Sequence, residues 1–485
     1  MVEVSQAANR GAVRLFIDGQ WRRGAEGGEK PFFNPATGTS AGAVCLASRN
    51  DLGDAVSAAD RAFAVWRETP PFERARVLGR AATELRRRVE QIATLLTTEV
   101  GKPLAQARGE VLSAADTLEW FAEEGKRCFG QVIPGRANSF HTLTRLEPVG
   151  IVAAFTPWNY PVSQSVKKLA AALAAGCAIV LKGSEEAPSA CAEVVKVLAE
   201  SGVAPGAVNL LFGEPAEVSE FLITHPLIRS VSFTGSVPVG KQLASLAGRH
   251  MKRIVMELGG HAPAIVCEDA DLTLAVDELV HMKFLNAGQV CLSPTRFLVA
   301  RPVYREFVAR FSSAARALKI GDGMAEHVDM GPLANARRLA KIEELVNDAI
   351  ACGAQTACGG KPMVQPGYFF PPTVLYDVPV HARAMNEEPF GPLALLRPFD
   401  TLGDAITEAN RLSYGLASYA YTRSIQAEST LTHRIDAGMV AVNRVFSSTI
   451  EAPFGGVKDS GYGTEGGTQA IRNFLTEKMI TRYVA

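Results

Sequence analysis

Residues 149–182 read VGIVAAFTPWNYPVSQSVKKLAAALAAGCAIVLK, and this stretch decides the fold. The apolar run 149–155 predicts a buried strand, 163–175 has a helical pattern, and 178–181 is a second apolar run. Gly176 stands where a helix C-cap is expected. A strand, a helix and a further strand in this order predict parallel strands joined by a right-handed crossover.

The same alternation continues along the chain and predicts a doubly wound α/β sheet. A second alternating set from about 264 to 445 predicts a second α/β domain. Upstream, apolar residues at three- and four-residue steps predict one amphipathic helix over 71–99, ended by Gly101 and Pro103. The further elements expected for the first sheet are strands at 208–212, 230–233 and 253–256 and helices at 188–200, 215–224 and 237–247.

Composition excludes several classes of function. The 485 residues exceed one typical core, so two or three domains are expected. The 50 basic and 50 acidic residues balance, which argues against a nucleic-acid or membrane-surface partner. The longest uncharged apolar run, Leu169 to Leu181, is too short to cross a bilayer and is interpreted as a buried helix followed by a buried strand.

Eight scattered cysteines give no CxxC spacing and no accompanying histidine cluster, so we expect no metal site. Residues 1–15 contain no apolar h-region, which argues against a secretory signal. We therefore expect reduced thiols and a cytoplasmic protein.

One cysteine and one glutamate stand in distinctive surroundings. Cys291 lies in NAGQVCLS, residues 286–293, and Glu257 lies in MELGG, residues 256–260. A cysteine thiol can act as a nucleophile and a glutamate carboxylate as a base. A glutamate that ends an apolar strand is also costly to bury without a role.

Together these motifs resemble the active site of the NAD(P)-dependent aldehyde dehydrogenase superfamily, and the resemblance runs from about residue 15 to the C-terminus. It implies a Rossmann-type doubly wound cofactor domain, an α/β catalytic domain and a β oligomerisation arm in a homodimer or homotetramer. The implied divisions are an NAD-binding domain (1–125 and 147–257), a catalytic domain (258–452), and an arm with a C-terminal tail (126–146 and 453–485).

The resemblance also assigns a cofactor site. No GxGxxG follows a predicted strand. Instead SFTGSVPVG, residues 232–240, places a glycine turn before a helix start, which suits a pyrophosphate. The alternative is an ordinary strand-to-helix turn with Ser236 as N-cap. The cofactor residues implied are Thr156, Pro157, Trp158, Lys182, Ser184, Glu185, Gly235, Ser236, Gly240, Leu258, Glu388 and Phe390.

Two further elements refine the cofactor prediction. KGSE, residues 182–185, resembles the family element in which Lys and Glu bind the adenosine ribose, with Gly183 in place of the usual Pro. Glu185 favours NAD over NADP, because a carboxylate repels a 2′-phosphate; alternatively, Lys182 and Glu185 belong to a solvated surface loop. EEPFGP, residues 387–392, makes Glu388 the partner of the nicotinamide ribose and Phe390 a wall beside the nicotinamide.

The remaining catalytic assignments also rest on the resemblance. TPWNYP, residues 156–161, matches a family element in which the Asn159 amide and the Cys291 backbone N–H form the oxyanion hole. Glu257 is then the base that hydrolyses the thioester, which favours a free acid as product. Lys168 matches a family lysine of the proton relay, and Glu465 matches a carboxylate near it; alternatively, Lys168 is an exposed helix residue.

The implied substrate tunnel mixes apolar walls with two cations. PFGGVKDSG, residues 453–461, and EWFAEE, residues 119–124, resemble the succinate-semialdehyde dehydrogenase group. Leu285 stands where that group commonly places an arginine for the substrate carboxylate, and Lys167 stands where it places another cation. A semialdehyde is therefore expected, with an uncharged aliphatic or aromatic aldehyde as the alternative. The implied tunnel residues are Tyr160, Lys167, Leu285, Leu292, Arg444, Phe446 and Phe454.

Two alternatives come from other classes of protein. A cysteine hydrolase or thioester-transfer enzyme could use Cys291 with Glu257, but it would not need Lys182, Glu185 and Glu388. A non-catalytic structural descendant would not need to keep Cys291, Glu257 and Asn159 together.

Overall fold

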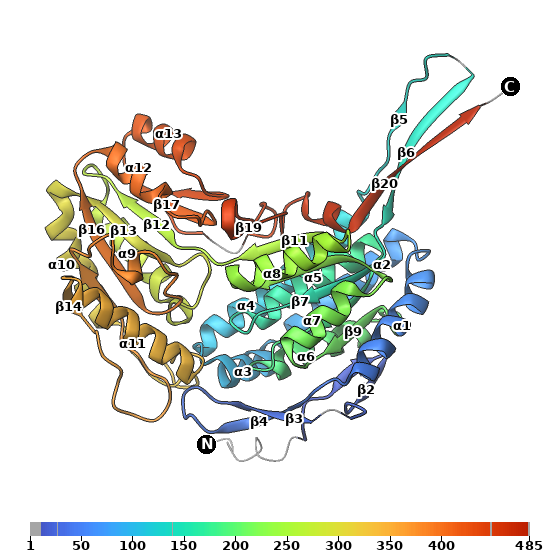
Figure 1. Cartoon of the computed structure of the whole chain (residues 1–485), viewed down its shortest axis with the longest axis horizontal. Helices are drawn as coiled ribbons and strands as arrows, with labels where there is room; N and C mark the ends of the chain where they lie inside the picture. Colours follow the sequence, from blue (N-terminus) through green and yellow to red (C-terminus); the bar gives the residue numbers. More distant parts are fainter. Residues whose placement is uncertain (1–10, 27, 138, 447–448, 484–485) are drawn as a thin grey trace.

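The structure is a computed structural model that describes residues 11–26, 28–137, 139–446 and 449–483. Two α/β lobes lie side by side, and a long β arm projects from one of them (Figure 1). Residues 1–10 of the expected first domain, residue 138 of the expected arm and the last two residues of the tail lie outside the described residues.

The first lobe is built on an eight-stranded sheet of order β19-β11-β10-β7-β8-β9-β1-β2. The five central strands are parallel, as predicted, and antiparallel strands close both edges. The strand order reverses between β7 and β10, which is where doubly wound sheets bind ligands. The strands are Leu15–Ile17 (β1), Gln20–Arg22 (β2), Ile151–Phe155 (β7), Ala178–Lys182 (β8), Val208–Leu211 (β9), Ile228–Gly235 (β10), Arg253–Leu258 (β11) and Gly461–Tyr462 (β19).

Helices cover both faces of this sheet. Helices α2 to α6 pack together on one face, and α1, α7 and α8 lie against the other. Gly176 ends α5 in the left-handed conformation expected of a C-cap. The helices are Arg49–Trp66 (α1), Pro71–Arg87 (α2), Val89–Val100 (α3), Leu104–Gly125 (α4), Pro161–Ala175 (α5), Pro188–Glu200 (α6), Pro215–Thr224 (α7) and Val237–Arg249 (α8).

The prediction of one helix over 71–99 is wrong, because the chain breaks at Arg88 between α2 and α3. The Arg88 N–H donates to the carbonyls of Glu84 and Leu85, which closes α2. The Arg88 guanidinium pairs with Glu84 and with Glu200 of α6. The break between α2 and α3 therefore lies at a residue that pairs with α6. The apolar periodicity of the sequence continues through this position and does not reveal the break.

Buried glutamates cap two helices of the first lobe. Helices α5 and α6 both begin with proline, and neither N-cap residue supplies a capping side chain. Glu110 of α4 accepts hydrogen bonds from the first N–H groups of α5, and Glu99 of α3 does the same for α6. Both carboxylates satisfy helix N–H groups that would otherwise lack partners.

The second lobe contains a seven-stranded sheet of order β14-β15-β16-β13-β12-β17-β18, parallel except for β14. This confirms the expected second α/β set. Its strands are Ala262–Val266 (β12), Pro294–Ala300 (β13), Gln355–Cys358 (β14), Thr373–Tyr376 (β15), Leu393–Phe399 (β16), Ala417–Tyr421 (β17) and Met439–Val442 (β18). Its helices are Leu272–Phe284 (α9), Arg301–Ala317 (α10), Ala336–Ala351 (α11), Leu402–Asn410 (α12) and Ile425–Arg434 (α13), with short 3-10 helices Leu285–Gly288 (η2) and Arg383–Met385 (η3).

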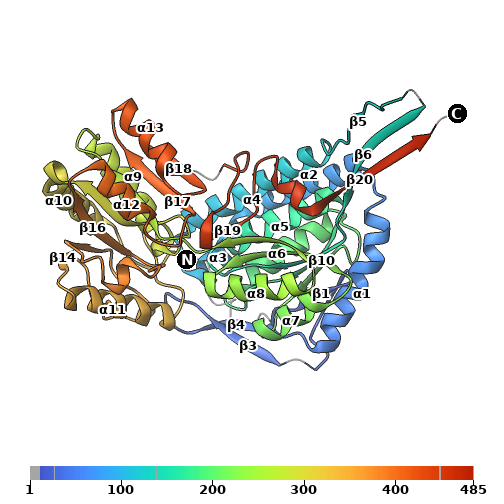
Figure 2. The same cartoon turned by 45° about the horizontal axis from the view of Figure 1, so that its top comes forward.

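The arm is a three-stranded antiparallel sheet that extends away from both lobes (Figure 2). Its long strands pair from Leu475 opposite Pro148 to Tyr483 opposite Phe140. The strands are Val132–Ile133 (β5), Phe140–Pro148 (β6) and Leu475–Tyr483 (β20). Two 3-10 helices, Lys458–Ser460 (η4) and Ala470–Phe474 (η5), come before β20 in the chain. Strands Glu29–Phe33 (β3) and Ser40–Cys45 (β4) form a separate hairpin.

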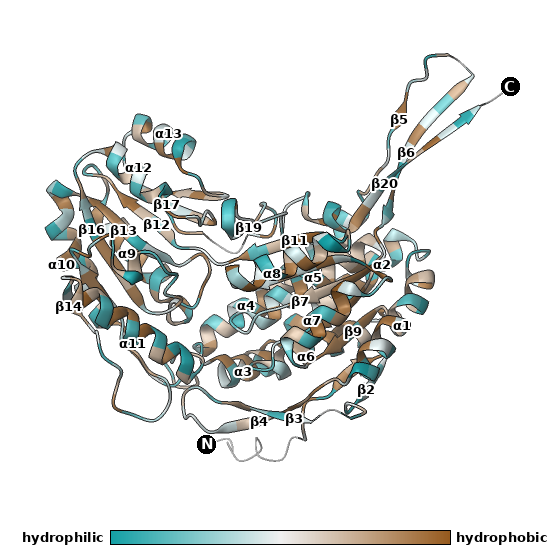
Figure 3. Ribbon diagram, viewed as in Figure 1, coloured by the Kyte–Doolittle hydropathy of each residue, from teal (hydrophilic) through white to brown (hydrophobic). Residues whose placement is uncertain are grey.

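Hydrophobic residues concentrate in the central strands of the two lobes, and the arm alternates polar and apolar residues (Figure 3). The first sheet has one core, mainly of residues 15–258, and the second sheet has two core clusters, both within residues 262–441. No helix among the described residues is both long enough and apolar enough to cross a membrane.

Candidate active site

The Cys291 loop has an unusual backbone. Asn286, Ala287 and Gly288 all have positive φ, at 49°, 53° and 71°. At Gly288 a Cβ atom would lie 2.2 Å from the carbonyl oxygen of Gly391, so only glycine lets the 387–392 loop approach this closely. Buried Gln289 fixes the turn, accepting from Ala334 N at 2.9 Å and donating to Asn286 O at 3.1 Å. The strained Cys291 loop is therefore held by the hydrogen bonds of Gln289 and by its close packing against the 387–392 loop.

The Cys291 thiol is protonated in the protein alone. Burial raises its pKa to about 12, and the nearby Glu388 carboxylate adds to the increase. The Lys167 ammonium lowers the pKa of the thiol, and the Glu257 carboxyl raises it. The thiol therefore needs a base or a nearby positive charge before it can act as a nucleophile.

Glu257 lies near the C-terminal end of β11, opposite Thr234 of β10 and Gly461 of β19. Its side chain is buried, and among the described residues neither carboxylate oxygen has a hydrogen-bond partner. Burial raises its pKa well above the ordinary value, Glu465 raises it further, and Lys167 and Lys168 oppose the shift. An unpaired buried carboxyl with a raised pKa suits a proton acceptor.

Lys168 and Glu465 form a buried ion pair near this carboxyl. The Lys168 ammonium also donates to the Thr234 hydroxyl at 2.7 Å, and that hydroxyl donates to Gln164 Oε1 at 3.4 Å. Lys168 is only 1% exposed, so its alternative interpretation as an exposed helix residue is wrong. The two predicted relay residues, Lys168 of α5 and Glu465 of the C-terminal segment, are therefore in contact, and Thr234 of β10, which was not predicted, joins them.

Asn159 lies beside the Cys291 loop. Its side-chain amide donates to Gln289 O at 2.9 Å, two residues before Cys291. The backbone carbonyl oxygen of Asn159 accepts from the Lys102 ammonium at 2.8 Å and from the Asn286 side-chain amide at 3.2 Å. The predicted oxyanion-hole residue is therefore hydrogen-bonded to the loop that carries the predicted nucleophile.

Sequence reasoning missed Lys102, Gln106 and Glu110, which contact both loops from α4 and from the segment just before it. The four-residue spacing was the available signal, because it places Gln106 and Glu110 on one face of a helix. Buried Lys283 was also missed; burial lowers its pKa to about 7, and it donates to Ser293 Oγ at 3.0 Å.

The predicted pyrophosphate turn lies at the reversal of strand order, after β10 and at the start of α8. Ser236 is the N-cap of α8, but its side chain makes no capping hydrogen bond to the helix. At Gly240 a Cβ atom would lie 2.4 Å from Leu258 Cδ2, so two predicted cofactor residues contact each other. Thr156, after β7, donates from its backbone N–H to Lys182 O at 3.2 Å.

The Lys182 and Glu185 side chains form an ion pair, with 2.7 Å between nitrogen and oxygen. Glu185 also accepts from Gly213 N at 2.9 Å, and Ser184 Oγ accepts from Glu186 N at 3.3 Å. Lys182 and Glu185 are buried, so the alternative of a solvated surface loop is wrong. Glu185 thus has a fixed position at the end of β8.

Glu388 lies against the glycine pair that follows Glu257. Its carboxylate accepts from Gly260 N at 3.1 Å, and a Cβ at Gly259 would lie 2.3 Å from its Oε2. Burial raises its pKa to about 7. Phe390 and Trp158 meet edge to face with ring centroids 5.7 Å apart, so the 387–392 loop contacts the loop after β7.

Several of the predicted tunnel residues contact an aromatic ring or a cation. The Lys167 ammonium lies 3.9 Å from the centre of the Phe454 ring, and Tyr160 lies under the Lys102 ammonium at 3.7 Å. Tyr419 links two others, donating to Leu292 O at 2.7 Å and packing on Phe446 at 5.2 Å. Leu285 is half-buried, whereas Arg444 is exposed beyond the end of β18 and forms no ion pair among the described residues.

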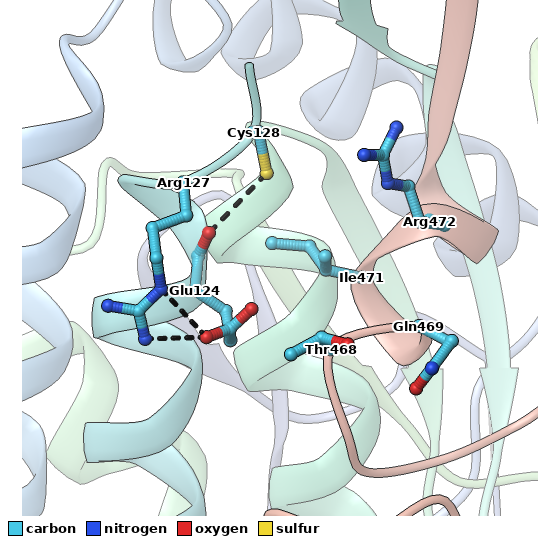
Figure 4. Close-up of a pocket in the computed structure, with 7 residues that line it drawn as sticks. All are labelled: Glu124, Arg127, Cys128, Thr468, Gln469, Ile471 and Arg472. Carbon is cyan, nitrogen blue, oxygen red and sulfur yellow. Dashed lines mark hydrogen bonds and ion pairs between the residues drawn. The ribbon is translucent and has the colours of Figure 1, made fainter.

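A separate pocket lies between the end of α4 and η5, away from these residues (Figure 4). Arg127, Cys128 and Arg472 line it, and the Cys128 thiol donates to Glu124 O at 3.5 Å. None of the predicted site residues belongs to it. The part of the chain that the structure describes contains no group of three or more His, Cys, Asp or Glu side chains suited to a metal ion.

The fold is a two-lobed α/β fold with a Rossmann-type sheet and a β arm, and comparison with known proteins places it in one family. The aldehyde dehydrogenase family model matches residues 21–480. The chain belongs to the aldehyde dehydrogenase family, which makes it an oxidoreductase acting on aldehydes. This membership removes the basis for the hydrolase alternative.

Its relatives include enzymes of more than one named activity. The chain is 49% identical over 471 residues to 4-(hydroxymethyl)benzenesulfonate dehydrogenase TsaD1 of Comamonas testosteroni, covering 97% of this chain and 98% of that enzyme. It is 39% identical over 465 residues to the succinate-semialdehyde dehydrogenase [NADP(+)] GabD of Escherichia coli K12, covering 96% of each. The crystal structure of succinate-semialdehyde dehydrogenase from Burkholderia pseudomallei matches with a TM-score of 0.96 at 37% identity, covering 100% of both chains.

Proposed function

We propose that this chain oxidises an aldehyde to a free carboxylic acid with NAD, through a thiohemiacetal and then a thioester on Cys291. The observation that carries this proposal is the buried Glu257 carboxyl, which has no hydrogen-bond partner among the described residues and interacts electrostatically with the Cys291 thiol. A thiol and a free carboxylate base near each other are what aldehyde capture and thioester hydrolysis require.

In the first half-reaction the Cys291 thiol loses its proton to solvent, the sulfur bonds to the aldehyde carbon, and the carbonyl oxygen becomes an oxyanion. The Asn159 amide and the Cys291 backbone N–H donate to this oxygen, and neither donor carries a charge that the ground state would also feel. The proposed cofactor residues would hold NAD, which would supply the acceptor for the hydride that leaves the carbon atom, so that a thioester remains on Cys291.

In the second half-reaction Glu257 takes a proton from water as the water attacks the thioester carbon. The carbon–sulfur bond breaks, the acid leaves, and the sulfur departs as a thiolate that takes a proton from solvent. Lys168 and Glu465 supply the route by which the Glu257 proton departs, supported by their ion pair and by the hydrogen bond from Lys168 to Thr234.

The proposed cofactor residues include those at the strand-order reversal, with the pyrophosphate at Gly235, Ser236 and the start of α8. They also include Lys182, Ser184 and Glu185 at the end of β8, and Glu388 and Phe390 of the second lobe. The preference for NAD rests on Glu185, which is fixed by Lys182 and Gly213. The GabD relative is named for NADP(+), so the family contains both preferences and the cofactor must be measured.

The proposed substrate is an aldehyde with an anionic group at its far end. The two named relatives act on a benzenesulfonate and a semialdehyde, and both of these carry an acidic group. Lys167 supports this proposal, because its ammonium lies 3.9 Å from the centre of the ring of Phe454, another proposed tunnel residue. The apolar Leu285 and Phe446 favour the second candidate, an uncharged aliphatic or aromatic aldehyde.

We further propose an NAD-binding domain (1–125 and 147–257), a catalytic domain (258–452), and an arm with its tail that makes a homodimer or homotetramer. The separate sheets and cores support this division, except that Gly461–Tyr462 extends the first sheet. The eight free cysteines support a reducing, cytoplasmic setting.

Substitution Cys291→Ala tests the proposal. Dehydrogenase turnover should disappear while NAD still binds, because the thiol forms the covalent intermediate and the cofactor contacts lie elsewhere. NADH formation measured by absorbance and NAD binding measured by calorimetry check the two parts. Full activity in the variant would overturn the assignment.

A further inference from the structure

Three polar side chains at four-residue spacing reach both catalytic loops from one side. Lys102 precedes α4 by two residues, and Gln106 and Glu110 lie in its first two turns. We call Lys102, Gln106 and Glu110 the α4 stripe. Lys102 and Glu110 are 1% and 4% exposed.

Lys102 supports the Asn159 backbone. Its ammonium donates to Glu110 Oε2 at 2.5 Å and to Asn159 O at 2.8 Å, and it lies 3.7 Å from the centre of the Tyr160 ring. These contacts hold the peptide that carries the Asn159 side chain.

Glu110 fixes the same loop from its other end. Its Oε1 accepts from Val162 N at 3.0 Å and from Ser163 N at 3.1 Å, at the start of α5. One buried ion pair therefore holds the backbone on both sides of Tyr160.

Gln106 supports the nucleophile loop. Its Oε1 accepts from Asn286 N at 2.9 Å, at the first of the three residues with positive φ. The Asn286 amide then donates to Asn159 O at 3.2 Å and to Gln289 O at 3.3 Å, which ties the two loops together.

A buried ion pair is weak evidence for added stability, because removing two charges from water costs about as much as their attraction returns. Such a pair can instead fix a geometry. An oxyanion donor must be placed to within a fraction of an ångström, and a displacement of about 1 Å costs about 100-fold in rate.

We propose that the α4 stripe positions the Asn159 amide relative to Cys291, so that Lys102, Gln106 and Glu110 are positioning residues for aldehyde capture. The inference rests on the proposed function, in which Asn159 stabilises the oxyanion. It adds that the donor is placed by three residues that are not among the proposed substrate residues.

The main test is the double variant Lys102→Met/Glu110→Gln. It removes both charges together, so no unpaired charge is buried, and the glutamine oxygen keeps an acceptor for Val162 and Ser163. The rate of the NADH burst is measured by stopped flow at saturating NAD, with the aldehyde that the wild type oxidises fastest. We expect the burst to slow by about 10- to 100-fold.

The same double variant is then made in an Asn159→Ala background. If the stripe acts through Asn159, the burst should slow by less than about threefold beyond Asn159→Ala alone, because coupled residues are not additive. Glu99→Gln is the matched control, since Glu99 caps α6 through Ser189 and Ala190 in the way Glu110 caps α5. The burst of this control variant should stay within about twofold of the wild type, because residues that share no partners act independently.

A second pair of variants covers the case in which the double variant does not fold. Gln106→Ala and Gln106→Glu both lose the hydrogen bond from Nε2 to Asp329 O, but only the glutamate keeps an acceptor for Asn286 N. We expect a burst about tenfold slower in the alanine variant, with most of the rate restored in the glutamate variant.

The outcomes separate the two proposals. If Asn159→Ala leaves the burst unchanged, the oxyanion role in the proposed function is wrong. If Asn159→Ala slows the burst but the stripe variants do not, or slow it equally in both backgrounds, the positioning role of the stripe is wrong and the proposed function stands.

Discussion

Lys168 and Glu465, 297 residues apart in the chain, form a buried ion pair near the Glu257 carboxyl. The pair leaves Glu257 without a hydrogen-bond partner among the described residues, although two cations and a carboxylate influence its pKa. A carboxyl that is buried but not neutralised by a direct contact can still exchange its proton, and this is what a base for thioester hydrolysis needs.

Glu257→Gln should separate the two half-reactions. Hydride transfer precedes the hydrolysis that needs the base, so a burst of about one NADH per active site should remain while steady-state turnover falls steeply. Rapid mixing with excess aldehyde and NAD measures both. Loss of the burst together with turnover would mean that Glu257 is required to activate the Cys291 thiol.

The wild type should use NAD better than NADP. The Glu185 carboxylate repels a 2′-phosphate in a partly desolvated pocket, and its contacts with Lys182 and Gly213 prevent it from turning away freely. Glu185→Gln should improve kcat/KM for NADP relative to NAD by roughly tenfold, through loss of this repulsion. A wild-type ratio near one would show that Glu185 does not face the ribose.

Lys167 and Arg444 are predicted to favour substrates with a distal anion. Losing one charge-assisted contact should cost about 1.5–3 kcal/mol, or roughly ten- to a hundred-fold in kcat/KM. The measurement compares succinate semialdehyde with an uncharged aldehyde of similar length, in the wild type, Lys167→Met and Arg444→Ala. Lys167→Met should have the larger effect, because Lys167 is held on Phe454 whereas Arg444 is exposed. A wild type that prefers the uncharged aldehyde, with no change in either variant, would make the anionic-substrate proposal wrong.

Stability should depend on pH through Glu99. Burial raises the pKa of Glu99 to about 7 from an ordinary value of 4.5. The folded protein therefore binds more protons than the unfolded chain between these values, and the free energy of unfolding falls as pH rises through that window. At about 1.4 kcal/mol for each tenfold change in proton affinity, the loss amounts to about 3 kcal/mol.

Glu99→Gln lacks this titration, so its free energy of unfolding relative to the wild type should increase by about 3 kcal/mol from pH 4.5 to pH 8. Urea unfolding at several pH values measures the difference. A difference that does not change with pH would show that Glu99 titrates normally in the folded protein.

The sequence predicted the parallel strands of both lobes because β7 to β11 are short apolar runs separated by helical patterns, and local spacing determines such elements. It did not predict the break at Arg88, where the apolar spacing continues and a pairing with Glu200 is visible only in three dimensions. Likewise, nothing local in α5 indicates that its N-terminal cap is Glu110, 52 residues before Val162.

The site was predictable to the extent that its residues stand in motifs. Cys291, Glu257 and Asn159 carry distinctive neighbours, and the structure brings their loops together. Lys102 and Gln106 carry no such motif, since a polar residue at the start of a helix is ordinary, and only the contacts with Asn159 and Asn286 give them significance. Their roles and those of the motif residues now await the substitutions described above.

The pairing of β19 with β11 has a consequence for synthesis of the chain. Met256 and Glu257 gain their second neighbouring strand only from Gly461 and Tyr462, and Lys168 gains its carboxylate partner only from Glu465. A ribosome must therefore translate beyond residue 465 before the surroundings of Glu257 are complete. Truncated products that end before residue 461 would carry the Cys291 thiol, but Glu257 would lack its finished surroundings.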